Sequence, residues 1–240
     1  MLKISASLIG LTLAINVNAA LYDRGNGLVY DDVLDITWLQ DANLAASKHF
    51  GVANINSNGS MNLSVAEQWI EAMNTESYLN HSSWRMPDVS PINGISFDTR
   101  ESNNGSTDNG YGGWSTFSEM GYMYYVNLGN LGLCEPNGSG STASCDVQDG
   151  WGLNNTGIFS NIQPGSSEHY WTIDEFPFVG TYHVWGFDFY RGRQTGFTPG
   201  NDFFVWAVHN GDIGAVPIPA AAWLFASALL GLVALKHRHA

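Results

Sequence analysis

The C-terminal segment, residues 216–240, most constrains what this chain can fold into, because its pattern suits a membrane better than a soluble core. An apolar run, residues 220–235, has Ser227 as its only polar side chain and is closed by Lys236 and Arg238. Such a run followed by basic residues is typical of a membrane span with a cytoplasmic C-terminus. Its helix would be about 24 Å long, short for a hydrocarbon core of about 30 Å. A buried core helix and a plain single-pass anchor are the alternatives.

The four residues before this run give it a more specific interpretation. Val216, Pro217, Ile218 and Pro219 precede the apolar helix and the short basic end. This order resembles the C-terminal sorting signals of the PEP-CTERM class, in the variant with the motif Val-Pro-Leu-Pro-Ala. The resemblance implies that an exosortase, a membrane protease or transpeptidase of Gram-negative bacteria, processes the tail. We therefore predict a sorting signal over residues 213–240, with a transmembrane helix at 220–235.

The N-terminus has the pattern of a secretory signal peptide over residues 1–19. Lys3 precedes an apolar stretch at 8–15, and Val17 and Ala19 are the small residues before a cleavage point. The apolar stretch is too short to be an uncleaved span. We expect export by the Sec pathway, anchorage in the inner membrane by the C-terminal helix, and sorting to the cell surface or extracellular matrix.

Residues 20–212 remain for a single domain, and that domain is strongly acidic. Its six basic side chains face twenty-two acidic ones, which gives a net charge of −16. Nucleic acid, anionic lipid and sulfated polysaccharide would all meet a charge of the same sign. The charge suits a solvated secreted surface, or else a site for cations.

The two cysteines, Cys134 and Cys145, flank a stretch rich in Gly, Ser, Asn and Pro. In an oxidising compartment this spacing predicts a disulfide that closes a flexible loop. A metal pair is the weaker alternative, because no further cysteine and no suitably spaced histidine accompanies them.

Local patterns predict an α+β fold with two or three helices and an antiparallel sheet. A hairpin joins 28–30 to 36–39 with Trp38 turned inward, and a brief helix follows at 42–48. Ser64 and Glu67 form a capping box that opens a core helix at 66–73. A second capping box at 116–119 opens a helix with Met120, Tyr124 and Leu128 on one face. Three β-rich runs at 169–173, 182–190 and 203–208 predict an antiparallel meander.

Several of these segments together resemble a known family. The hairpin ending at Trp38, the helix containing Trp69, and Trp84-Arg85-Met86-Pro87 follow one another as in the Lcl C-terminal domain family, whose usual motif is Trp-Arg-Leu-Pro. The last strand also matches, although His209 and Asn210 replace the usual arginine and proline. The resemblance implies a C-type-lectin-like α+β fold, and the best-studied member is an adhesin that binds sulfated glycans. The positions that we assign to the structural motif are Trp38, Trp69, Trp84, Arg85, Pro87, Trp185 and Trp206.

Arg85 has two possible roles. In a chain with few positive charges, an arginine between a tryptophan and a proline segment is expected to be held by a carboxylate or by backbone carbonyls. It would then fix the fold, and contact with a ligand is the alternative.

No catalytic or metal site is apparent in the sequence. The Asn/Gly/Asp-rich loop at 90–114 offers oxygen atoms for Ca²⁺, but without the spacing of an EF-hand. Glu135-Pro136-Asn137 resembles the calcium and sugar motif of C-type lectins, yet its Trp-Asn-Asp counterpart is missing, so chance explains it better. The histidines lack metal-site spacing, and nucleophile elbows and phosphate loops do not occur.

These observations favour a non-catalytic, lectin-like surface or matrix protein. Exposed aromatic side chains on long loops could stack on sugar rings. The net charge argues for neutral or cation-bridged polysaccharide rather than sulfated polymers. An extracellular hydrolase acting on matrix polymer and a passive matrix component are the alternatives.

Overall fold

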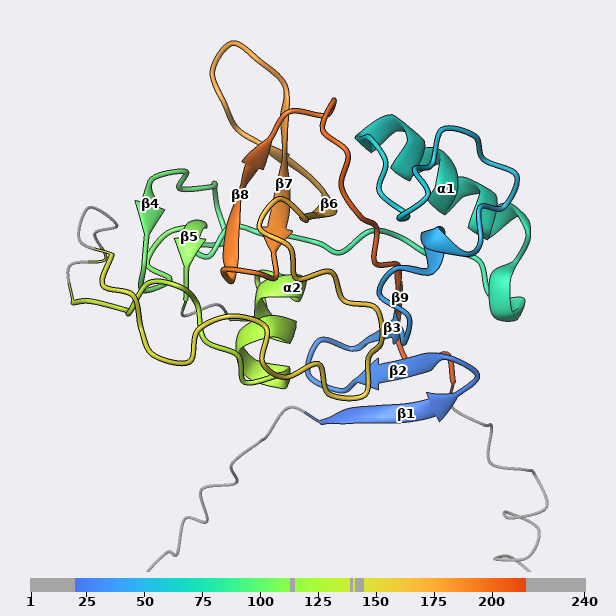
Figure 1. Cartoon of the computed structure of the whole chain (residues 1–240), viewed down its shortest axis with the longest axis horizontal. Coiled ribbons are helices and arrows are strands. Elements are labelled where there is room, and N and C mark those ends of the chain that lie inside the picture. Colours follow the sequence, from blue (N-terminus) through green and yellow to red (C-terminus); the bar gives the residue numbers. More distant parts are fainter. Residues whose placement is uncertain (1–19, 113–114, 139, 141–144, 215–240) are drawn as a thin grey trace, which may run out of the picture.

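A computed structural model describes residues 20–112, 115–138, 140 and 145–214 of the 240-residue chain. The predicted signal peptide and the motif, transmembrane helix and basic end of the predicted sorting signal lie outside the described residues. Among the described residues no helix is long and apolar enough to cross a membrane. Two short α-helices and two sheets make the fold a mixed α+β one, as predicted (Figure 1). The strands are β1 (Leu21–Gly25), β2 (Leu28–Asp31), β3 (Ile36–Leu39), β4 (Glu101–Ser102), β5 (Asn109–Tyr111), β6 (Tyr170–Phe176), β7 (His183–Asp188), β8 (Arg193–Phe197) and β9 (Val208–Asn210), and the helices are α1 (Leu63–Thr75) and α2 (Glu119–Tyr122).

The first sheet has the strand order β1-β2-β3-β9 and joins the two ends of the described chain. The predicted hairpin is its centre, with Val29 paired to Trp38 and both side chains fully buried. β9 closes the sheet against β3, and Arg24 of β1 forms a two-pronged ion pair with Asp212 just after β9. The first and last described residues therefore lie against the same sheet (Figure 1).

The second sheet has the order β4-β5-β8-β7-β6. β6, β7 and β8 form an antiparallel meander whose first two strands were predicted, whereas the β4–β5 pair is parallel, so the sheet is not purely antiparallel. The prediction of its third strand was wrong. The predicted third strand was residues 203–208, but β8 pairs with β7 in its place. Residues 203–208 pass between the two sheets. In this extended segment Phe203 hydrogen-bonds Met61 in both directions and Phe204 pairs with His169 and Trp171, so it never forms one continuous ladder.

The main core lies where this segment crosses between the two sheets. Aromatic rings meet there, with Trp38 and Trp206 at 4.7 Å and Phe159 and Trp206 at 4.9 Å between centroids. The indole N–H of Trp206 donates to the Leu39 carbonyl at 2.7 Å, which satisfies the one polar atom of a fully buried ring. Burial of these large rings is the main source of stability for the body.

Helix α1 begins earlier than its predicted capping box. Asn62 is the N-cap, and its side-chain oxygen accepts the Val65 amide at 3.1 Å, so the assignment of the cap to Ser64 was wrong. Ser64 and Glu67 lie within the helix and are exposed. Ala66, Trp69 and Met73 are fully buried, which confirms the core face.

Helix α2 is capped by Ser118, whose hydroxyl accepts the Gly121 amide, and it continues as a π-helical turn at Met123–Asn127. Met120, Tyr124 and Leu128 are buried on one face as predicted. The brief helix predicted at 42–48 is only a 3₁₀ turn at Leu44–Ala46. Asp41 accepts the Asn43 amide in a local turn rather than capping a longer helix.

Candidate functional site

The motif Trp84-Arg85-Met86-Pro87 forms a strap that connects α1 and both sheets. Asn74 at the end of α1 holds Trp84 by two hydrogen bonds, from its amide nitrogen to the Trp84 carbonyl and from the Trp84 amide to its oxygen. Arg85 exchanges two backbone hydrogen bonds of 2.9 Å with Val208 of β9. The Pro87 carbonyl accepts the Ile173 amide of β6 at 3.0 Å. The strap therefore fixes where α1 lies relative to β6.

Arg85 is held inside this strap by every N–H group of its guanidinium. Glu119 at the start of α2 accepts two of these contacts at 2.6 and 2.8 Å. Asn210 accepts two more through its side-chain oxygen, and the Met86 carbonyl accepts one at 3.0 Å. With its donors saturated and its charge balanced, Arg85 has the environment of a fold-fixing arginine.

Two further carboxyl groups lie next to this ion pair. Asp174 of β6 accepts the Val89 amide at 2.7 Å and shares a hydrogen bond with Asp88. Burial, followed by that shared hydrogen bond, raises the pKa of Asp174 to about 7. Asp174 is therefore protonated in a large fraction of the molecules near neutral pH, which limits repulsion among three neighbouring carboxyl groups.

An open groove of about 560 Å³ runs between α1 and the strap. Its apolar surface comes from Ile70 of α1, Met86 of the strap and Ile173 of β6, and the Ile173 side chain is 53% exposed. The polar part of the lining includes amide and carboxylate groups from α1 together with the saturated Arg85. The full lining is Glu67, Ile70, Glu71, Asn74, Thr75, Trp84, Arg85, Met86 and Ile173.

The tip of the β6–β7 hairpin exposes large apolar side chains near this groove. Phe178, Val179 and Tyr182 are 57%, 97% and 52% exposed. The pKa of the Tyr182 hydroxyl is raised, first by partial burial and then by the negative charges of Glu67 and Glu175. Tyr182 therefore lies within electrostatic reach of Glu67 on the α1 wall, although it does not itself line the groove.

The α1 wall of the groove carries two carboxylates without partners. Glu67 and Glu71 are one helical turn apart and exposed, and neither makes a hydrogen bond or ion pair within the described part of the chain. Like charges at this spacing disfavour a helix by about 0.2–0.5 kcal/mol. The wall is thus locally acidic and uncompensated.

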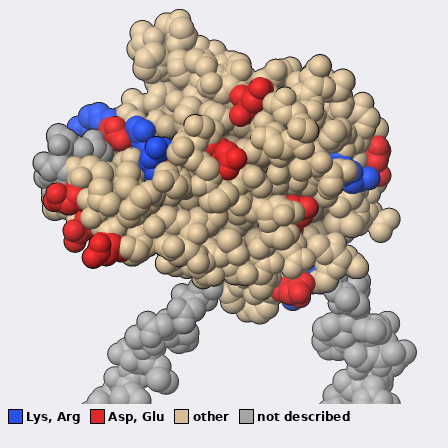
Figure 2. Space-filling view, viewed as in Figure 1, with Lys and Arg blue, Asp and Glu red and all other residues tan. Residues whose placement is uncertain are grey.

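The basic side chains differ from these two unpaired carboxylates, because each Lys and Arg within residues 20–214 has a carboxylate partner. On the face in Figure 2, uncharged residues dominate and basic side chains lie beside acidic ones. The described chain therefore offers no unpaired cationic side chain to an anionic ligand. The pairs are Arg24–Asp212, Lys48–Glu76, Arg85–Glu119, Arg100–Asp98, Arg191–Asp188 and Arg193–Glu101.

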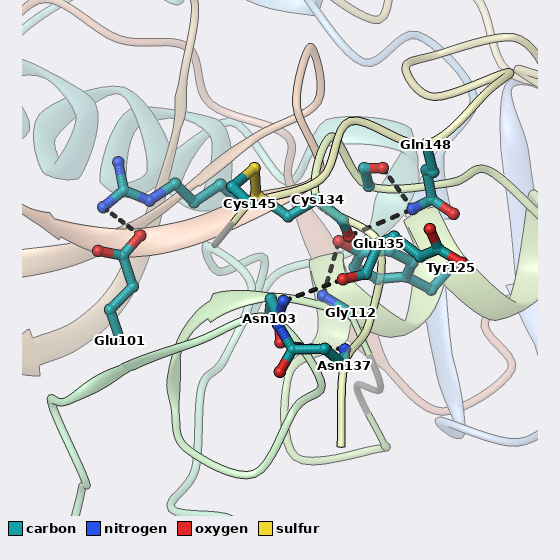
Figure 3. Close-up of a disulfide and its surroundings, with 11 residues drawn as sticks. Glu101, Asn103, Gly112, Tyr125, Cys134, Glu135, Asn137, Cys145 and Gln148 are labelled. Carbon is teal, nitrogen blue, oxygen red and sulfur yellow. Dashed lines mark hydrogen bonds and ion pairs between the residues drawn. A yellow bond between two sulfur atoms is a disulfide. The ribbon is translucent and has the colours of Figure 1, made fainter. Parts of the chain in front are cut away.

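The predicted disulfide between Cys134 and Cys145 is confirmed, and its loop packs on the Asn-rich loop (Figure 3). Asn103 donates to the Glu135 carbonyl at 2.9 Å and accepts the Asn137 amide at 3.3 Å. Backbone atoms of Glu135-Pro136-Asn137 thus serve loop packing. The buried carboxylate of Asp108 is likewise occupied by the amides of Ile92 and Asp98.

The described residues contain no group of three His, Cys, Asp or Glu side chains placed to hold a metal ion. Among the histidines in the described part of the chain, His81 and His209 approach each other, with ring centroids 5.7 Å apart. Both ring nitrogens of His209 contact backbone carbonyls, those of Ser82 and Asn210, at 2.7 Å. His209 therefore ties the chain beside the strap, at the position where the sequence suggested a lost arginine.

The structure brings only part of the predicted motif to the groove. Trp84 and Arg85 line it, and Pro87 hydrogen-bonds Ile173 behind it. The other four motif tryptophans, Trp38, Trp69, Trp185 and Trp206, are fully buried in the body. Sequence reasoning missed the groove residues Glu71, Asn74 and Ile173 and the nearby Tyr182. The spacing of Glu67, Glu71 and Asn74 on one helix face was the available signal.

Comparison with known proteins agrees with the motif. The family model for the Lcl C-terminal domain matches residues 27–209, from the β1–β2 turn to β9. Neither the curated proteins nor the solved structures contain a match to this chain. The matched region includes the hairpin, α1, the strap and both sheets. The chain belongs to the Lcl C-terminal domain family.

Proposed function

We propose that this protein is an exported, non-catalytic polysaccharide-binding protein with a C-type-lectin-like domain, and that the groove between α1 and the strap is its binding site. The groove itself carries this proposal. It combines an apolar floor, formed by Ile70, Met86 and Ile173, with polar groups on α1, and the exposed Tyr182 of the neighbouring hairpin lies within electrostatic reach of Glu67. Sugar rings present apolar C–H faces and polar edges, which suits such a lining.

The groove also favours one class of polysaccharide over another. A sulfated polymer needs unpaired basic side chains, whereas each described Lys and Arg has a carboxylate partner. The net charge of −16 for the exported part acts in the same direction. We therefore propose ligands without negative charge and expect no binding of sulfated glycans.

Replacement of Tyr182 by alanine tests the site. The ring is about half exposed, so its loss should leave the melting temperature unchanged while weakening binding by roughly three- to tenfold, as expected for one aromatic stacking contact. Calorimetric titration with neutral hexasaccharides selected on a glycan array would measure this change.

Tyr22→Ala provides the matched control, because Tyr22 is 42% exposed but lies on β1 in the other sheet. Equal effects of the two substitutions would contradict the assignment of the groove. Failure of every glycan on the array to bind, with and without Ca²⁺, would leave a passive structural role.

A hydrolase acting on matrix polymer is the alternative function. The proton-sharing pair Asp88 and Asp174 favours it, because a carboxyl that holds a proton near neutral pH can act as a general acid. Incubation of the protein with array-positive oligosaccharides would distinguish the two functions. Shorter products lost on Asp174→Asn substitution would establish hydrolysis.

We further propose that the chain reaches the cell surface or matrix through its two terminal signals. The sequence supports this with the signal pattern at 1–19 and with Val216-Pro217-Ile218-Pro219 before the apolar run. An exosortase-type enzyme would then remove or replace the end of the chain. The mass of the exported protein measures this directly, and an intact C-terminus at Ala240 would contradict processing.

A further inference from the structure

We infer that the groove prefers a polysaccharide with free amino groups, that is, a cationic amino-sugar polymer. This inference rests on the proposed function, since it takes the α1 groove as a sugar site and names the class of sugar. Its basis is the combination of an apolar groove with a wall of uncompensated negative charge.

The floor of the groove suits a chain of pyranose rings. Ile70, Met86 and Ile173 provide apolar contact, and the groove is open to solvent, so a polymer can pass along it without burying an end. Asn74 lies at the end of the wall, where its side chain is already bonded to Trp84. The orientation of this end is therefore fixed before a ligand arrives, which reduces the entropy cost of binding.

Charge complementarity identifies the substituent on the rings. Glu67 and Glu71 project from successive turns of α1, about 6 Å apart along the helix axis, a spacing comparable to one sugar unit. Glu175 adds negative charge on the hairpin side, where it acts on Tyr182 together with Glu67. The one cation in the lining, Arg85, is neutralised by Glu119. Ammonium groups on successive sugars would supply the charge that this wall lacks.

A lysine-rich peptide would carry the same charge, but the groove favours the sugar. The apolar floor of Ile70, Met86 and Ile173 offers a contact surface for ring faces, and the half-exposed Tyr182 ring is available on the neighbouring hairpin. Flexible lysine side chains present no such faces and lose more conformational entropy on binding. Hexalysine is therefore a necessary comparison ligand.

The test compares glucosamine hexamer with its N-acetylated counterpart at pH 6, where the free amines are charged. The purified protein should bind the glucosamine hexamer roughly fivefold to tenfold more tightly, which corresponds to two exposed ion pairs. Raising the salt from 50 to 500 mM should remove most of this preference, since exposed charges are screened.

The double substitution Glu67→Gln and Glu71→Gln locates the effect. It should remove the preference for the glucosamine hexamer, so that the variant binds both hexamers with the same affinity. Both side chains are exposed and unpaired, so thermal unfolding should show an intact fold. Glu135→Gln is the control, because it makes the same type of charge change at an exposed residue in the disulfide loop.

The outcomes separate this inference from the proposed function. Equal, salt-independent binding of both hexamers would overturn the amino-sugar preference and leave the groove as a sugar site. Hexalysine binding as tightly as the glucosamine hexamer would overturn it as well, because charge alone would then suffice. If neither hexamer nor any array glycan binds, the proposed function fails and the inference fails with it.

Discussion

Arg85 shows how much of this fold depends on one side chain. It connects the strap to α2 through Glu119 and to the end of β9 through Asn210, two residues that lie far from it in sequence. Its neighbour in the sequence, Trp84, is held by Asn74 of α1. The sequence predicted that a carboxylate or backbone carbonyls would hold this arginine, but Glu119 could not be singled out among twenty-two acidic residues.

Replacement of Arg85 by alanine should lower the stability by about 2–3 kcal/mol, because it leaves the buried Glu119 without its partner. Thermal and urea unfolding would measure the loss. Arg100→Ala is the matched control, since Arg100 also pairs with a carboxylate but is 83% exposed, and its melting temperature should not change. An unchanged stability of Arg85→Ala with lost glycan binding would make Arg85 a ligand contact instead.

At the scale of elements, the sequence around the start of α1 offers two possible N-cap residues. Both Asn62 and Ser64 are good cap residues, and Ser64 has the glutamate three positions later that a capping box needs. The structure uses Asn62, because starting there keeps Leu63 and Val65 buried beneath the first turn.

Substitution of Asn62 by alanine should therefore cost about 1 kcal/mol, as for other N-caps. Ser64→Ala, by contrast, should have almost no effect, because Ser64 is exposed within the helix. Chemical denaturation of the two variants would compare them. A larger loss for Ser64→Ala would contradict the observed cap.

The strands show where local reasoning succeeds and fails. The hairpin of β2 and β3 was predictable from its alternating pattern and turn, and so was β7 with Phe187 and its aromatic neighbours. β8, Arg193–Phe197, has no apolar pattern and exists because β7 and β5 pair with it on both sides. Residues 203–208 have strong β-propensity, yet their backbone partners come from four separate places.

At the scale of the whole molecule, the groove could not be predicted, because it is formed by α1, the strap and β6 from three distant parts of the chain. The motif tryptophans were predictable as core residues from their size and pattern. Tyr182 looked like one more β-strand residue until the hairpin placed it beyond the last pair of β6 and β7. The groove residues that share one face of α1 could be recognised from their spacing in the sequence, whereas the groove residues on the strap and β6 could not.

The raised pKa of Asp174 should appear in the stability of the whole molecule. Because its folded pKa, about 7, is above its ordinary value of 3.8, the folded state binds the extra proton between these values. Ionisation of Asp174 therefore lowers the free energy of unfolding progressively as the pH rises from about 4 to 7. Asp174→Asn should be about 1–2 kcal/mol more stable than wild type at pH 8, once solvent screening at this partly exposed site is considered.

Urea unfolding of both proteins at pH 4.5 and pH 8 would measure this difference. At pH 4.5 most of the advantage of the variant should disappear, because Asp174 is then protonated in the folded wild type. Because the variant is compared with wild type at each pH, the contributions of the other carboxylates to the stability cancel. A variant less stable than wild type at pH 8 would contradict the assigned protonation.

The two ends of the described chain determine how the body would carry a mechanical load. Ala20 and Gly214 lie at the first sheet, whereas the β6–β7 hairpin tip is at the opposite end of the body (Figure 1). If the protein is tethered by its C-terminus while a polymer pulls on the groove, tension enters at Gly214. The Arg24–Asp212 pair and the contact of Ile213 with Thr37 resist first, followed by the pairing of β9 with β3. The strap is joined to β9 further from Gly214, at Asn210 through the Arg85 side chain and at Val208 through the backbone, so the contacts nearest the tether must open before the pull can separate β9 from the strap.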